Sequence, residues 1–214
     1  MPASSRAVSN RIWTIPNQIT TARLVLSIVV FAAIGLRAYL TGLIVFIVAA
    51  ATDWVDGYWA RRYNEVSKVG RIFDPFVDKI IICGSFIFLA AEPDSRIVPW
   101  MAVVVVGREL LVTALRGAIE QAGGDFSANF AGKLKMVFQC AAVVASLLVL
   151  WYKPHVPQGL DMAAVSLIWL AVVSTVYSGG IYVRAAFTSF PAAAGLEESP
   201  DEDEHEHDAD SPTG

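Results

Sequence analysis

The chain has 214 residues, of which 55% are hydrophobic and only 17% are charged. This composition excludes an ordinary soluble globular protein and predicts an integral membrane protein with one membrane domain. The formal net charge of −4 hides an uneven distribution: nine of the twenty acidic residues lie between Glu197 and Asp210, so the other eleven are outnumbered by sixteen basic residues. Cys83 and Cys140 stand alone in apolar runs, which argues against a disulfide framework or a zinc site.

Six apolar runs predict an all-α fold, a bundle of six transmembrane helices. Each run is close to the length that crosses a hydrocarbon core of about 30 Å. The third is short unless Asp74 to Lys79 forms its polar end. Ahead of the bundle, Ser4 to Trp13 is expected to lie along the interface as a short helix. The predicted spans are residues 18–37, 39–60, 76–91, 96–118, 133–152 and 161–185.

The distribution of Lys and Arg predicts the orientation of the bundle. With the N-terminus inside, thirteen of the sixteen basic residues lie on or near the cytoplasmic side. Only Arg37, Arg96 and Lys153 would face outward. This bias predicts a multi-pass protein of the cell membrane with both termini in the cytoplasm (N-in/C-in).

The first span opens with a short polar motif. Pro16 and Asn17 are followed by Thr20 and Arg23. On its own this pattern is typical of a Pro/Asn helix start with an arginine whose head group snorkels to the interface.

Two aspartate pairs lie at the facing ends of the second and third spans. The first pair stands in D53-W-V-D-G-Y-W-A-R61, and after eight residues the second stands in G70-R-I-F-D-P-F-V-D78. Residues three or four apart share a helix face, so the four carboxylates can converge. Because one aspartate at mid-membrane costs about 2.5 to 3.5 kcal/mol, such a group needs a positive partner. Oxygen ligands at this density suit Mg²⁺, Mn²⁺ or Ca²⁺. Alternatively, the aspartates merely end helices near the head groups or face an ion path.

The stretch matches the signature D-x2-D-G-x2-A-R-x8-G-x3-D-x3-D at every position. In this it resembles the CDP-alcohol phosphotransferases, membrane enzymes of phospholipid synthesis. The resemblance implies that an alcohol attacks the β-phosphorus of a CDP-activated lipid and that CMP leaves. It also implies two Mg²⁺ (or Mn²⁺) ions. Asp53, Asp56 and Asp74 would hold the first, Asp53, Asp74 and Asp78 the second, and Asp78 would be the general base.

Four further positions of this stretch are expected to contact the CDP-lipid. Gly57 and Ala60 are small, so a nucleotide can press against the helix, although close helix packing explains small residues equally simply. Arg61 is placed to contact phosphate, and Ser67 matches a hydroxyl position near the nucleotide in the family. The first-span motif resembles the entry of the branch that makes phosphatidylglycerophosphate and would close one side of the same site. Its residues are Pro16, Asn17, Thr20 and Arg23.

Four basic residues are candidates for binding a phosphate on the acceptor alcohol. Positive-inside decoration of helix ends would explain Lys133 and Lys135, but not Arg108, which follows an apolar run within the fourth span. An arginine buried in a membrane usually has an anionic partner. The spacing of Arg108, Arg116 and the two lysines also resembles the phosphatidylglycerophosphate branch, whose acceptor is glycerol 3-phosphate. Met136 departs from that pattern, where Thr is expected.

The predicted function is therefore transfer of a phosphatidyl group from CDP-diacylglycerol to sn-glycerol 3-phosphate. The same chemistry with inositol phosphate, serine or phosphatidylglycerol is the nearest alternative. A divalent-cation transporter would give Gly57, Ala60 and Arg61 no role, and a prenyltransferase would not need the basic residues. The family resemblance also suggests a homodimer; the partners expected are membrane lipid and the two substrates, and no nucleic acid.

The chain after Phe190 is rich in Pro, Ala, Glu and Asp and is expected to be a disordered acidic tail. The predicted organisation is thus an N-terminal interfacial segment (1–17), a membrane domain (18–190) and the tail (191–214).

Overall fold

The computed structural model describes residues 15–63, 68–121 and 130–194. Side chains are described for most of these residues, but not for 53–63, 68–75 and Asp78, nor for several near other helix ends. The described residues form six helices and no strand, which confirms the all-α prediction with the helices in the expected order. They are α1 (Ile15–Gly35), α2 (Tyr39–Tyr63), α3 (Lys68–Ala90), α4 (Pro99–Gln121), α5 (Phe130–Trp151) and α6 (Gln158–Ala194).

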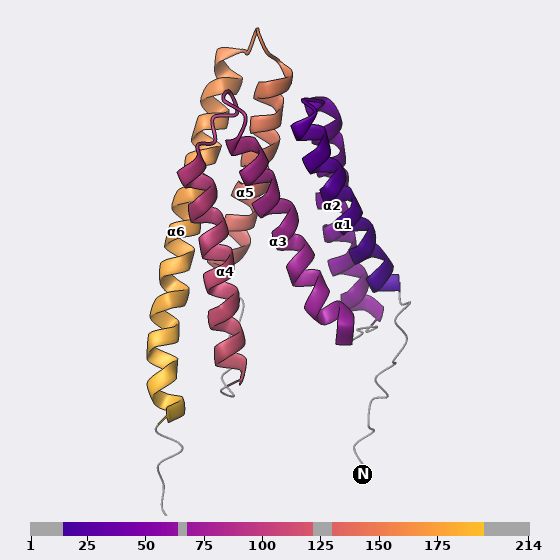
Figure 1. Cartoon of the computed structure of the whole chain (residues 1–214). Coiled ribbons are helices and arrows are strands. Elements are labelled where there is room, and N and C mark those ends of the chain that lie inside the picture. The colour runs from indigo at the N-terminus through magenta and orange to yellow at the C-terminus, as the bar shows by residue number, and fades with distance from the viewer. Residues whose placement is uncertain (1–14, 64–67, 122–129, 195–214) are drawn as a thin grey trace, which may run out of the picture.

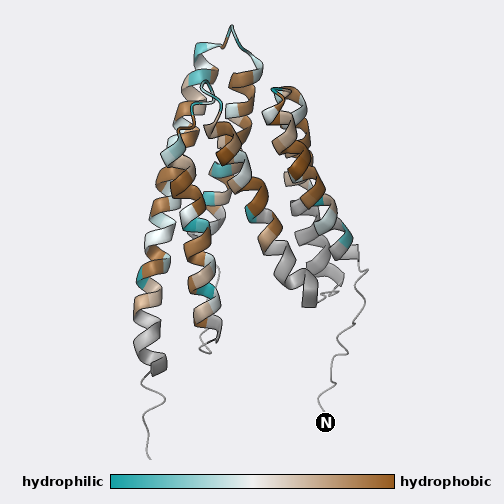
Figure 2. Cartoon of the chain, in the orientation of Figure 1, coloured by the Kyte–Doolittle hydropathy of each residue, from teal (hydrophilic) through white to brown (hydrophobic). Residues whose placement is uncertain are grey.

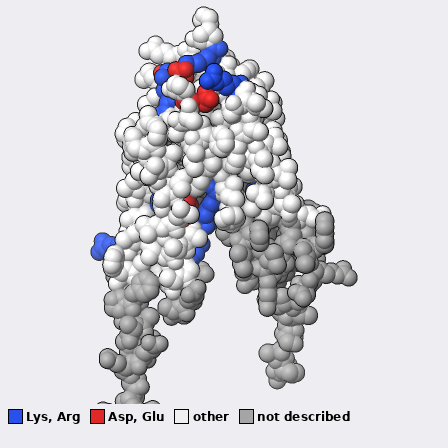
Figure 3. Space-filling model, in the orientation of Figure 1, with Lys and Arg blue, Asp and Glu red and all other residues white. Residues whose placement is uncertain are grey.

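Successive helices run in opposite directions along one bundle axis (Figure 1). The connections 36–38, 91–98 and 152–157 lie together at one end, at the top of Figure 1. Helix α5 packs against α2, α3 and α6, whereas α1 packs against α2 and α3, and α4 against α3 and α6. Toward the other end, the group of α1, α2 and α3 diverges from α4 and α6 (Figure 1). Figure 3 shows the molecule hollowed between these two groups, with Lys and Arg atoms at the closed end of the hollow.

The hydrophobic core lies near the end where the helices are connected by these three loops. Its members come from the C-terminal halves of α1, α3 and α5 and from the N-terminal halves of α2, α4 and α6. The helices are therefore held together at the loop end, and they separate toward the other end (Figure 1). Fully buried side chains, one from each helix, are Ile34, Phe46, Phe86, Val105, Leu147 and Ile168.

The outer surface of the bundle is apolar. Leu36, Val103 and Phe187 are 70 to 80% exposed, and other large apolar side chains are exposed on every helix. Figure 2 shows that apolar residues make up much of the described helices. Apolar surface of this extent is typical of a lipid-facing protein. Among the described residues, Leu134–Trp151 and Gln158–Phe187 are long and apolar enough to cross a membrane. Shorter apolar stretches lie in α1, α2 and α3.

Most helix ends differ from the predicted spans by one to nine residues, and three of these differences bear on the predicted organisation. Helix α1 begins at Ile15, so Pro16 and Asn17 lie in its first turn rather than before it. Proline fits there because the first backbone N–H groups of a helix have no intrahelical acceptor. Helix α3 begins at Lys68 and includes the polar stretch ahead of its apolar part. Helix α6 has 37 residues and ends at Ala194, beyond the predicted start of the tail. The predicted interfacial helix and residues 195–214 lie outside the described residues.

Ion pairs hold the connecting loops together. Arg96 Nε lies 2.8 Å from Asp161 Oδ1, and Arg37 Nε lies 3.7 Å from Glu92 Oε2. Lys153 pairs with Asp94 in the same region. The three basic residues predicted to face outward are thus all at one end of the bundle. Exposed pairs of this kind contribute at most about 1 kcal/mol each, so they fix loop positions more than they stabilise the fold.

The contact between α1 and α3 depends on Gly84. A Cβ atom at this position would lie 2.1 Å from Phe31 Cζ. The Phe31 ring is stacked on Phe88 with centroids 5.2 Å apart, so moving the ring away from Gly84 would disturb this stacking.

We therefore expect Gly84→Ala to destabilise the protein by about 1 to 3 kcal/mol, the usual cost of overpacking a core. Thermal unfolding in detergent measures the effect. Gly117→Ala is the matched control, since the described structure has no heavy atom within 4 Å of a Cβ there. Equal unfolding midpoints for the two variants would contradict the expectation.

Candidate active site

The aspartate motif lies on two helices, as its spacing predicts. Asp53 and Asp56 belong to α2, and Asp74 and Asp78 belong to α3. The helical backbone places each pair on one helix face, because its members are three or four residues apart. Their side chains lie outside what the structure describes, so convergence of the four carboxylates stays a prediction. The described side chains themselves contain no group of three or more His, Cys, Asp or Glu that could hold a metal.

The other predicted CDP-lipid residues are described only in part. Gly57, Ala60 and Arg61 lie on α2 and Pro16 and Asn17 on α1, all without described side chains, and Ser67 lies outside the described residues.

Thr20 and Arg23 on α1 are described and buried, with exposed fractions of 6% and 3%. Ser27 Oγ donates a 2.8 Å hydrogen bond to the carbonyl oxygen of Arg23. The Arg23 side chain lines a small cavity of about 50 Å³ together with Met136 and Cys140 of α5. This position inside the bundle does not fit an arginine that snorkels to the surface.

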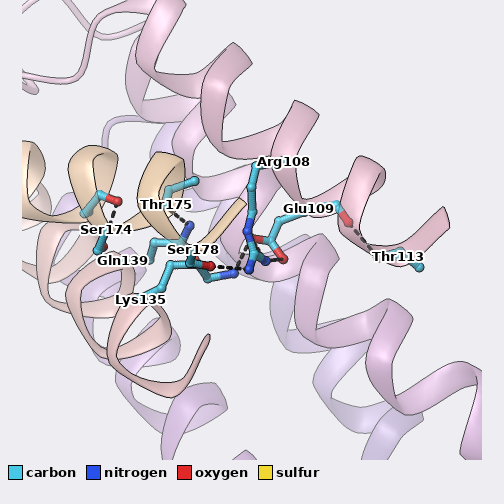
Figure 4. Close-up of polar contacts among 9 residues, drawn as sticks. Arg108, Glu109, Thr113, Lys135, Gln139, Ser174, Thr175 and Ser178 are labelled. Atoms are coloured by element: carbon cyan, nitrogen blue, oxygen red, sulfur yellow. Dashed lines mark hydrogen bonds and ion pairs between the residues drawn. The ribbon is translucent and has the colours of Figure 1, made fainter. Parts of the chain in front are cut away.

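A buried cluster of charges joins α4 to α5. Arg108 Nη1 lies 3.2 and 3.3 Å from the two carboxylate oxygens of Glu109. Lys135 Nζ donates to Glu109 Oε1 from the neighbouring helix. The three side chains are only 7 to 10% exposed. Figure 4 shows them converging between the two helices. The structure thus brings together two of the four predicted acceptor-binding residues around a shared carboxylate.

Helix α6 supplies the third side of this cluster. Arg108 Nη2 donates to Ser178 Oγ, and Arg108 Cζ lies 5.4 Å from the centroid of the Tyr182 ring. One turn toward the loop end, Gln139 Nε2 donates a 2.9 Å hydrogen bond to Thr175 Oγ1. The cluster and the neighbouring Gln139–Thr175 pair thus place polar contacts between α4, α5 and α6 (Figure 4).

The cluster carries more positive than negative charge. Arg108 and Lys135 contribute two cations, and Glu109 contributes one carboxylate. Arg108 Nε is buried and has no hydrogen-bond partner in the described part of the chain. An uncompensated buried cation is costly, so the arrangement suits an anion with several oxygen acceptors. A phosphate group meets that requirement, since charge-assisted bonds to its oxygens satisfy arginine and lysine donors.

The two remaining acceptor candidates are less closely placed. Arg116 lies seven residues after Glu109 on α4, hence on nearly the same face and roughly 10 Å farther along the helix. Its Nε is also buried without a hydrogen-bond partner among the described residues. Lys133 lies on α5, but its side chain is outside what the structure describes.

Sequence reasoning gave no role to Glu109, Ser178 or Tyr182. The position of Glu109 directly after Arg108 was a usable signal, because a buried arginine needs an acid. Ser178 and Tyr182 are four residues apart on α6 and so share a face, but an apolar helix often carries such residues for packing. Only the tertiary contact with Arg108 distinguishes them.

Comparison with known proteins agrees with the motif. Residues 13–177 match the CDP-alcohol phosphatidyltransferase family. A Bacillus subtilis (strain 168) protein named CDP-diacylglycerol--glycerol-3-phosphate 3-phosphatidyltransferase is 37% identical over 79% of this chain and 93% of its own length. A protein of the same name from Rickettsia typhi is 30% identical over 82% of this chain and 98% of its own. A third protein of this name, from Yersinia pestis (strain Pestoides F), is 29% identical over 68% of this chain and 78% of its own length.

Proposed function

The chain belongs to the CDP-alcohol phosphatidyltransferase family, and on that premise we propose that it transfers the phosphatidyl group of CDP-diacylglycerol to sn-glycerol 3-phosphate. The products would be phosphatidylglycerophosphate and CMP. Support for these two substrates comes from the names of the similar proteins and from the chemistry of the buried cluster.

The observation that favours a phosphate-bearing acceptor is the charge of the cluster of Arg108, Glu109 and Lys135. The two buried cations, Arg108 and Lys135, share the carboxylate of Glu109. The Nε atom of Arg108 is also buried without an acceptor in the described structure. A neutral acceptor would leave this positive charge uncompensated among the described side chains. The phosphate of glycerol 3-phosphate would balance it and leave the hydroxyl end of the molecule free to react. Arg116 and Lys133 would extend the same site toward the cytoplasmic end of the helices.

Four carboxylates would form the catalytic centre. Paired carboxylates on two helix faces are a suitable donor set for two Mg²⁺ (or Mn²⁺) ions, held by Asp53, Asp56, Asp74 and Asp78. When bound, the ions would neutralise charge on the pyrophosphate and acidify the incoming hydroxyl. A carboxylate oxygen of Asp78 would accept the proton of that hydroxyl while the hydroxyl oxygen of the acceptor attacks the β-phosphorus. Arg61 and Ser67 would contact the CDP-lipid, and Gly57 and Ala60 would let it approach α2.

We further propose six membrane spans with both termini in the cytoplasm and the catalytic centre facing the cytoplasm. All three basic residues expected outside lie at the loop end of the bundle, opposite the aspartate-bearing ends of α2 and α3. Helix α4 is 23 residues long, enough to cross, although Arg108, Glu109 and Arg116 lower its hydropathy. The membrane domain would comprise residues 18–190, with 1–17 along the interface, 191–214 as a tail, and a homodimer as the assembly.

One assay tests this function. Purified protein is incubated with CDP-diacylglycerol, Mg²⁺ and one labelled alcohol at a time: glycerol 3-phosphate, inositol phosphate, serine, or phosphatidylglycerol. We expect phosphatidylglycerophosphate from the first and little lipid product from the others, and loss of turnover in EDTA that Mg²⁺ or Mn²⁺ restores. A preference for another alcohol would contradict the proposed acceptor. Turnover that survives chelation would contradict the role of the ions.

A further inference from the structure

One face of α6 contacts Arg108 at three places: an edge of the guanidinium group, the flat face of that group, and the aliphatic part of the side chain. Ser178 Oγ accepts a hydrogen bond from Arg108 Nη2. The Tyr182 ring lies 5.4 Å from Arg108 Cζ, within the range of a cation–π contact. At Gly179, which lies between them, a Cβ atom would be 3.1 Å from Arg108 Cγ. The absence of a side chain at Gly179 therefore lets the arginine stem lie against the α6 backbone.

These contacts fix the orientation of a side chain that would otherwise be flexible. A free arginine loses considerable rotamer freedom when it binds a ligand, and that loss weakens binding. Here Glu109 and Ser178 already hold two of the guanidinium nitrogens, and Tyr182 restricts the plane of the group. Arg108 Nε stays buried without an acceptor in the described structure. The guanidinium is thus set in one orientation with a donor still available.

A side chain at position 179 would press on the stem of Arg108. Its Cγ would have to move by a few tenths of an ångström, while its head group stays tied to Glu109 and Ser178. The guanidinium would tilt, and a bidentate contact with a phosphate depends on that orientation.

We propose that Ser178, Gly179 and Tyr182 are positioning residues that orient Arg108 toward the phosphate of the acceptor, so that α6 determines how tightly the acceptor binds. This inference rests on the proposed function, because it takes Arg108 as a ligand of that phosphate. The three residues act through Arg108 and not on the reacting atoms. Variants at these positions should therefore change the KM for glycerol 3-phosphate and not the KM for CDP-diacylglycerol.

Adjacent glycines on α6 provide a matched experiment. Gly179→Val places a branched side chain against the stem of Arg108, whereas at Gly180 a Cβ atom would meet no described heavy atom within 4 Å. Both substitutions change the same helix by the same chemistry, so effects on helix propensity are shared. We expect Gly179→Val to raise the KM for glycerol 3-phosphate about tenfold, comparable to the loss of one charge-assisted contact, with the KM for CDP-diacylglycerol changed by less than about twofold. Gly180→Val should leave both near wild type.

Two further positions keep the proposal testable if Gly179→Val does not fold. Tyr182→Leu removes the aromatic face and should raise the KM for glycerol 3-phosphate about three- to tenfold, whereas Tyr182→Phe keeps the ring and should restore most of the affinity. Ser178→Ala should raise the same KM without affecting the other substrate.

The outcomes separate this inference from the proposed function. A wild-type protein that does not use glycerol 3-phosphate, or an Arg108→Ala variant with an unchanged KM, would refute the proposed acceptor site itself. If wild type and Arg108→Ala behave as expected but the folded α6 variants have wild-type KM values, the positioning role is wrong. Equal increases in both KM values would likewise overturn it, because general distortion of the bundle would then be the cause.

Discussion

Asp78→Asn should reduce turnover by a factor of about 10² to 10⁴, the range attributed to a general base. The proposed role of Asp78 is to take the proton of the attacking hydroxyl, and the amide of Asn cannot accept it at the same position. Asn is also a weaker ligand for a divalent ion than a carboxylate, so the loss should fall at the upper end of that range. The measurement is kcat with saturating CDP-diacylglycerol and glycerol 3-phosphate in Mg²⁺.

The controls for Asp78→Asn concern folding and the other aspartates. The variant should keep the unfolding temperature of the wild type in detergent and still bind the CDP-lipid. Asp53→Asn should be at least as harmful, because Asp53 is assigned to both ions. Asp161→Asn, which changes an aspartate of the outer ion pair with Arg96, should leave kcat near wild type. An Asp78→Asn variant that retains more than about a tenth of wild-type activity would rule out the assigned role.

The helices could be predicted from the sequence because each apolar run is long and is separated from the next by polar residues, Gly or Pro. Their number and order are confirmed among the described residues. The boundaries were harder to predict, since helix formation continues through polar residues once a helix has started. Helix α3 thus extends back to Lys68, well before its apolar part, and Pro16 lies inside the first turn of α1. Hydropathy places the start of a span where its apolar run starts, so it misses both of these starts.

The candidate site was predictable to different extents. The aspartate motif identifies its helices and the faces of those helices, because the spacing alone determines them. Arg108 was singled out because it interrupts an apolar run, and the structure pairs it with the predicted Lys135 through Glu109. The contribution of α6 could not be predicted. The contact between Arg108 and Ser178 joins residues 70 positions apart and depends on the close approach of α4 to α6 at Gly179.

Arg108→Ala should raise the KM for glycerol 3-phosphate by about ten- to a hundredfold, because a charge-assisted contact with phosphate contributes roughly 1.5 to 3 kcal/mol. The KM for CDP-diacylglycerol should change little. Arg108→Lys should recover only part of the affinity. An ammonium group lacks the planar fork of donors by which a guanidinium contacts Glu109, Ser178 and a phosphate together.

The alternative for Arg108 is a purely structural role as the counter-charge of Glu109. Lys135 still pairs with Glu109 when Arg108 is removed, so the carboxylate keeps a partner and the bundle should stay folded. Arg184→Ala, which removes an exposed arginine of α6, is the matched control and should leave both KM values near wild type. Free glycerol should be a very poor acceptor for the wild-type enzyme. The Arg108→Ala substitution should lower the activity with glycerol little further, because glycerol has no phosphate to contact. If activity with glycerol and with glycerol 3-phosphate fell by the same factor, Arg108 would act on the fold and not on the acceptor phosphate.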